Sequence, residues 1–262
     1  NHVSQRLISQ TRSMKHSRKL IISLLSLLIV STVIYSIVFP HILRGMMIRQ
    51  SDFVEIADHV FVSLQTSEGQ RDSLLTYLDT AHSRNEKFWG QRIAFPDVVF
   101  CHDIETAKEY GYGGSPASFF MTPFYSFVMI APTGLHPDII SHEMCHPELF
   151  QRAGWLKHTL VFPVWFFEGI AMQVDHRAFY SDSAWQVITN QGETAPPLES
   201  MDDLAGFFDG NFQLNYSTSK HEVNRWLNIV GNEGIKSLIE ESGLTTDFYE
   251  LYQKIEGDFA GR

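Results

Sequence analysis

Residues 20–39 form the feature that most constrains this chain, because they are twenty successive residues without a charged side chain. A helix rises about 1.5 Å per residue, so such a run would span roughly the 30 Å hydrocarbon core of a bilayer. A buried core helix would be shorter or show a polar stripe, and a signal peptide has a shorter apolar region with an A-x-A-like exit. The exit here is YSIVFPHIL. We therefore expect an uncleaved, single-pass membrane anchor, with a cleaved signal peptide as the alternative.

Basic residues flank this run unevenly, with five before it and two shortly after it. The positive-inside bias then places residues 1–19 in the cytoplasm and residues 50–262, as one compact domain, on the extracytoplasmic side of the cell membrane. The stretch MKHSRKLIISLL, which begins at Met14, resembles a translation start followed by a basic region and an apolar segment. We accordingly expect residues 1–13 to lie outside the natural product.

The charge of the domain excludes one class of partner. Seven of the 20 Lys and Arg side chains lie in residues 1–50, which hold no Asp or Glu, so the rest of the chain carries 13 basic and 30 acidic side chains. A body with a formal charge of −17 is poorly suited to nucleic acid, which needs clustered Lys and Arg. The two cysteines, Cys101 and Cys145, exclude a dense disulfide framework; we expect two buried thiols, although they could pair in an oxidising compartment.

Strand patterns precede helix patterns along the domain, which predicts an α+β fold with a small mixed sheet and a C-terminal helical lobe that closes a cleft. Short β-branched and apolar runs favour strands at 58–66, 92–103 (a strand pair) and 124–134. Helical spacing of apolar residues, with start and stop signals, favours helices at 68–90, 105–110, 138–154, 163–179, 214–231 and 233–242.

The segment SHEMCHPELF contains the pattern H-E-x-x-H, formed by His142, Glu143 and His146. Residues four apart share one face of a helix, so the two imidazoles can bind one cation while Glu143 lies beside it. Glu168 follows in PVWFFEGIAMQ, on the next expected helix. It could complete a His, His, Glu ligand set for Zn²⁺, whose catalytic sites use three protein ligands. A solvated glutamate is the alternative, but an unpaired carboxylate among such apolar neighbours would be costly.

With these motifs, residues 90–240 resemble the gluzincin zinc metallopeptidases, in particular bacterial peptidase MA-like proteins. The resemblance rests on H-E-x-x-H in SHEMCHPELFQRAG, on P-x-W-F-x-E-G-x-A in PVWFFEGIA and, more weakly, on the tyrosine-led segment YSTSKHEVNRWLNIVG. It implies a zincin-like domain in which His142, His146 and Glu168 bind zinc and Glu143 is the catalytic base. It also implies that the strand near residues 124–132 forms the sheet edge along which an extended peptide substrate lies.

The same resemblance implies an oxyanion donor and suggests further roles. Tyr216 occupies about the place of the tyrosine that related enzymes present after the third ligand, although a core or surface tyrosine is equally compatible with the sequence. His221 is the second candidate donor, against an ordinary solvated histidine. Asp175, seven residues after Glu168, could orient a ligand histidine, against an exposed aspartate at a helix end. These roles describe a membrane-anchored zinc peptidase.

Pro147 departs from the expected pattern, because proline inside a helix removes an N–H and crowds the carbonyl four residues back. We expect the helix to kink or stop there, which affects activity more than metal binding. Two other functions remain open. One is a non-catalytic protein that binds metal or peptide on a peptidase-like fold, and the other is a small-molecule metallohydrolase on the same scaffold.

Overall fold

The computed structural model describes residues 23, 26–27, 30–32 and 34–261. The expected cytoplasmic segment, residues 1–19, lies outside the described residues, as do residues 20–22, 24–25, 28–29 and 33 of the expected anchor. Within the part that the structure describes, no helix is both long enough and apolar enough to cross a membrane.

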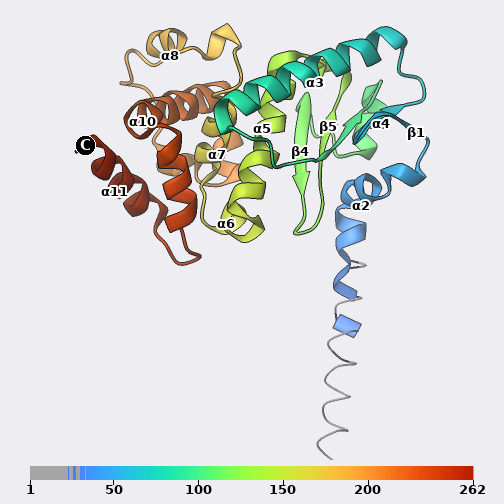
Figure 1. Ribbon diagram of the computed structural model, residues 1–262, viewed down its shortest axis with the longest axis horizontal. Coiled ribbons are helices and arrows are strands. Elements are labelled where there is room, and N and C mark those ends of the chain that lie inside the picture. The colour runs from blue at the N-terminus through green and yellow to red at the C-terminus, as the bar shows by residue number, and fades with distance from the viewer. Residues whose placement is uncertain (1–22, 24–25, 28–29, 33, 262) are drawn as a thin grey trace, which may run out of the picture.

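The described chain is a mixed α+β structure in which the strands lie in the first half and most helices in the second (Figure 1). The strands are β1 (Phe53–Ala57), β2 (Val60–Ser63), β3 (Asp97–Phe100), β4 (Ala117–Met121) and β5 (Ser126–Ile130). The α-helices are α2 (Pro40–Met46), α3 (Glu68–Trp89), α4 (Ile104–Glu109), α5 (Pro137–Ala153), α6 (Trp155–Leu160), α7 (Val164–Ala171), α8 (Asp182–Ile188), α9 (Leu204–Phe208), α10 (Phe212–Glu241) and α11 (Phe248–Ala260). Short 3₁₀ turns are η1 (Ile48–Gln50), η2 (Pro132–Gly134), η3 (Ala178–Tyr180) and η4 (Leu198–Met201).

The five strands form one mixed sheet in the order β1-β2-β3-β5-β4. β2, β3 and β5 are parallel, whereas the outer strands β1 and β4 run antiparallel to their neighbours. The central strands are buried on both faces, which explains their short, almost wholly apolar sequences. Their alternate side chains pack against α3 and α5 on one face and against α2 and α4 on the other.

A second core holds the helical lobe together. It joins α5 to α7, α10 and α11 through large apolar side chains, among them the fully buried Trp165, Phe166 and Trp226. α5 therefore belongs to both cores: its Ile140 packs under the sheet, and its Leu149 packs in the helical lobe. The expected α+β class, mixed sheet and C-terminal helical lobe agree with this structure.

Several expected elements need correction. The strand pair at 92–103 is wrong, because only β3 forms there; the preceding loop instead directs the N–H groups of Ile93 and Ala94 to the buried carboxylate of Glu148. The helix at 163–179 is too long, since α7 ends at Ala171. The strand expected at 124–134 exists as β5, but it lies inside the sheet rather than at its edge. The edge on that side is β4, which was not predicted because it directly follows a glycine-rich loop.

Two expectations about helix interruption have different outcomes. α5 does not stop at Pro147 but continues to Ala153, where Gly154 ends it with a positive φ of 79°. The two helices expected at 214–231 and 233–242 are the two parts of α10, which Gly231 separates with a φ of 61°. Such a φ strains residues with a side chain, so glycine suits this joint.

Candidate metal centre

Two helices bring the expected ligands together. α5 begins at Pro137, where the His136 side chain accepts a hydrogen bond from the N–H of Asp138, and its inward face carries His142 and His146. α7 follows two turns of α6 and presents Glu168 to the same point. All three side chains are buried.

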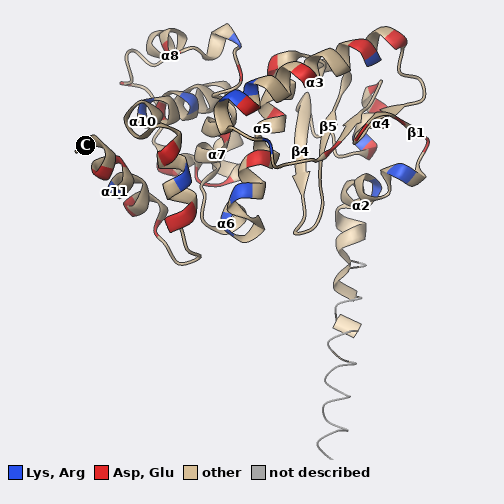
Figure 2. Ribbon diagram, viewed as in Figure 1, with Lys and Arg blue, Asp and Glu red and all other residues tan. Residues whose placement is uncertain are grey.

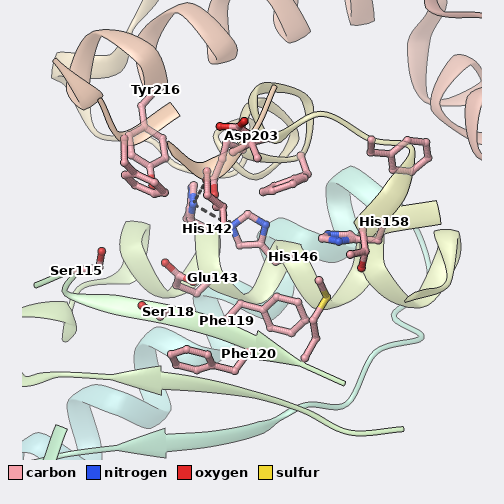
Figure 3. A pocket seen from close by; sticks show the side chains of 18 of the residues that line it. Ser115, Ser118, Phe119, Phe120, His142, Glu143, His146, His158, Asp203 and Tyr216 are labelled. Carbon is pink, nitrogen blue, oxygen red and sulfur yellow. Dashed lines mark hydrogen bonds and ion pairs between the residues drawn. The ribbon is translucent and has the colours of Figure 1, made fainter. Parts of the chain in front are cut away.

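The three candidate ligand atoms form a small triangle (Figure 3). Nε2 of His142 lies 3.1 Å from Oε2 of Glu168 and 3.2 Å from Nε2 of His146, and the third side of the triangle, from His146 to Glu168, is 3.6 Å. Two imidazole nitrogens and a carboxylate oxygen pointing at one place form a group that could hold a metal ion.

The pKa shifts of the triangle favour an ionised Glu168 and a neutral His146. The pKa of Glu168 lies below its usual value: burial alone would raise it, but the His146, His142 and His158 side chains more than offset that effect. Burial lowers the pKa of His146 to about 3, so its ring is neutral and its nitrogen can act as a ligand. For His142, burial also lowers the pKa, but the hydrogen bond and charge of Glu168 raise it above the usual value.

Glu143 lies on the same helix and faces the cavity rather than the triangle (Figure 3). Burial raises its pKa to about 7, although the charges of His142 and Arg177 and a hydrogen bond from the Phe119 backbone oppose that rise. A carboxyl group with a pKa near neutrality can both accept and release a proton, which is the property of a general base.

The cavity beside the triangle has a volume of about 800 Å³ and a largely apolar wall. Its walls come from the edge strand β4, from the middle of α5, from α6 and α7, and from the segment around α9. Figure 3 shows β4 passing along one side, with Ser118, Phe119 and Phe120, while Tyr216 lies on the other side. The cavity thus separates the sheet from the helical lobe, where the sequence predicted a cleft.

Tyr216 lies where an oxyanion donor is expected, on the cavity wall with its ring 5.8 Å from the His142 ring. Burial, and then the charges of Glu168 and Glu143, raise its pKa well above the usual value, so the phenol keeps its proton. His221 is elsewhere: it stacks on Trp185 at 3.6 Å and lies 3.1 Å from Asp182, and it does not line the cavity.

Asp175 is not an exposed residue at a helix end, because its side chain is completely buried beyond the end of α7. Arg177 donates from Nε to both of its carboxylate oxygens, at 3.0 and 2.9 Å. Nδ1 of His142 has no hydrogen-bond partner among the described residues, so Asp175 does not orient this ring through a hydrogen bond. The negative charge of Asp175 nevertheless raises the pKa of His142.

Two polar residues of this region were not predicted from the sequence. His158 of α6 is buried at the cavity and stacks on Phe167 with the ring centroids 5.0 Å apart. Neither of its ring nitrogens has a hydrogen-bond partner within the described part of the chain, and burial lowers its pKa to about 4. Glu148, which follows Pro147, is buried and paired with Arg152. The sequence could have indicated a buried role for Glu148, because this charged residue interrupts an apolar helical stripe. No sequence pattern predicted the burial of His158.

Comparison with known proteins adds no family: no protein-family model and no curated protein matches this chain.

Proposed function

We propose that this protein is a zinc-dependent peptidase, with His142, His146 and Glu168 as metal ligands and Glu143 as the catalytic base. The observation that carries the proposal is the triangle of ligand atoms with sides of 3.1 to 3.6 Å. Tetrahedral ligands about 2.0–2.1 Å from a zinc ion lie roughly 3.3 Å from one another, so the triangle fits zinc without rearrangement. A zinc ion bound there would polarise a carbonyl group and acidify water.

The chain's own residues supply the remaining functions. With its pKa near 7, Glu143 can take a proton from the attacking water and deliver it to the leaving amine. The hydroxyl of Tyr216 stays protonated and can donate a hydrogen bond to the oxygen that becomes negative. A substrate bound against the largely apolar cavity wall would displace water, which strengthens both interactions.

The edge strand β4 supports a polypeptide as the substrate. It pairs with β5 on one side only, and its side chains line the cavity on the other. An extended peptide can add to such an edge through backbone hydrogen bonds, which would place its carbonyl groups beside Glu143. β4 takes the role that the resemblance gave to the strand near residues 124–132.

Metal content and peptide cleavage together test this function. Purified wild-type chain should contain about one transition-metal ion, identified by elemental analysis, and should cleave members of a mixed peptide library. Glu143→Gln should retain the metal and lose activity by about 10² to 10⁴, because it removes the base. Glu168→Ala should lose metal and activity together. Normal metal content in Glu168→Ala would refute the site, and cleavage by Glu143→Gln at the wild-type rate would support the non-catalytic alternative.

A further inference from the structure

Three segments that are distant in sequence expose apolar side chains along one side of the domain, the lower edge in Figure 1. The first is the turn at residues 122–125 between β4 and β5, where Phe124 is 97% exposed. The second is α6, which ends in Leu160, 66% exposed. The third is the loop between α10 and α11, where Leu244 is 54% exposed.

The chain also enters the domain from this side. The described residues 34–38 are helical and extend below the domain in Figure 1, and Ile37 among them is 73% exposed. α2 then fixes this segment to the domain through the buried side chain of Ile42. A hydrogen bond of 2.6 Å from the hydroxyl of Tyr125 to the carbonyl of Gly45 joins α2 to the turn that carries Phe124. The exposed turn and the entering helix are therefore neighbours.

Charge is absent from the turn and from the entering helix, as Figure 2 shows. Residues 34–43, 122–125 and 242–246 contain no Asp, Glu, Lys or Arg, although the chain after residue 50 carries a formal charge of −17. Lys157, the one Lys or Arg of α6, turns inward and donates from Nζ to the carbonyl of Ile239 at 2.7 Å. The turn and the entering helix thus form an uncharged apolar surface, which suits a lipid surface rather than water, whereas the loop at 242–246 lies between Glu241 and Asp247.

We propose that the turn at residues 122–125, Leu160 and Leu244 rest on the lipid bilayer that residues 20–39 are expected to enter. Phe124 then inserts its ring among the headgroups next to the anchor, while α6 and the loop after α10 touch the same surface farther along. This contact places the cavity beside the bilayer, because Met121 and Thr159, which line it, directly precede the turn and Leu160. The segments of polypeptide that reach the cavity are then those close to the membrane.

Site-specific labelling of the full chain tests the contact. Phe124→Cys and Leu160→Cys, each carrying a polarity-sensitive fluorophore, are reconstituted in nanodiscs of phosphatidylcholine and phosphatidylglycerol. Cys101 and Cys145 are buried, and burial raises the pKa of each thiol to about 12, so the folded chain should be labelled at the new site. Val187→Cys is the matched control, because Val187 is an apolar residue, 81% exposed, on α8 at the opposite side of the domain.

At positions 124 and 160 the emission of the fluorophore should be blue-shifted relative to its emission at position 187. Lipids with a nitroxide in the upper acyl chain should also quench it severalfold more strongly at these two positions than at position 187. Equal quenching at all three positions would overturn the proposal, as would failure of the folded wild-type chain to enter nanodiscs. The measurement needs neither metal nor substrate, so its outcome is independent of the proposed peptidase activity. The unsubstituted chain, treated with the same reagent, gives the background from the native thiols.

Discussion

Removal of the Tyr216 hydroxyl can distinguish an enzyme from a protein that only binds metal. If this hydroxyl donates to the developing oxyanion, Tyr216→Phe should keep the metal and the fold but lower the turnover number by about 10² to 10³, or roughly 2.7 to 4 kcal/mol of barrier. The bond forms in the transition state, so KM should change little. Steady-state kinetics and metal analysis check this prediction.

Tyr180→Phe provides the control for that substitution. Tyr180 is buried with its ring 6.0 Å from that of Tyr216, yet it is not part of the cavity wall. We expect removal of the Tyr180 hydroxyl to leave the turnover number nearly unchanged. Equal rates for wild type and Tyr216→Phe, with Glu143→Gln inactive, would assign Tyr216 a structural role.

His158 predicts a pH dependence of stability in the metal-free chain. Its pKa is about 4 in the folded state and near 6.5 when unfolded, so the unfolded chain takes up the proton first as the pH falls. The folded state should lose up to about 3 kcal/mol between pH 6.5 and pH 4 from this group. Above pH 6.5 the group makes no such contribution.

His158→Phe should remove this part of the pH dependence, because a phenyl ring keeps the stacking on Phe167 and has no nitrogen to protonate. Urea unfolding at pH 7 and pH 4 measures the difference. At pH 7 the variant should be at least as stable as wild type, since two unpaired buried nitrogens are removed. An unchanged acid sensitivity would mean that His158 is hydrated or paired in solution.

At the scale of elements, α7 meets α10 through Gly169, the residue after the candidate ligand Glu168. A Cβ atom at this position would lie 2.5 Å from Cγ2 of Val223 and 2.6 Å from the carbonyl oxygen of Ser219. Gly169→Ala should therefore push the two helices apart, lower the free energy of unfolding by roughly 1 to 3 kcal/mol and weaken metal binding. Chemical denaturation and metal titration give the two values.

Gly257→Ala in α11 is the matched helical control, because nothing lies within 4 Å of a Cβ atom at that position. Alanine has the better helix propensity, so this variant should gain up to about 1 kcal/mol and bind metal normally. If Gly169→Ala behaves in the same way, close packing of α7 on α10 does not position Glu168.

Elements with a strong local pattern were predictable. α3 has a Ser67 and Gln70 capping box and a long amphipathic pattern, so its 22 residues were found almost to their ends. The sequence predicted that His142, His146 and Glu168 come together, because two motifs specify them, and the structure brings them into one group that could hold a metal ion. By contrast, β4 is short and follows a glycine-rich loop, and Asp175 and Arg177 meet in a turn that depends on tertiary contacts. Such features have no periodic signal in sequence.

At the scale of the whole molecule, the candidate metal centre lies where the two cores meet, since α5 contributes to both. A metal that binds the folded chain should therefore stabilise it by about 2.7 kcal/mol when its free concentration is 100 times the Kd. Thermal unfolding with and without a chelator measures the shift. Glu168→Ala should abolish the shift, whereas an equal shift in that variant would indicate metal binding elsewhere.

The core shared by α5 and α11 also sets the order in which the site can assemble during synthesis. Cys145 and Leu149 of α5 pack in the same cluster as Ile255, close to the end of the described chain. Roughly a hundred residues separate them, which at 5–20 residues per second corresponds to about 5 to 20 s of translation. During that interval His142 and His146 have left the ribosome, but α5 lacks its packing partners in α11. We therefore expect the candidate metal centre to be completed late, after α11 has emerged.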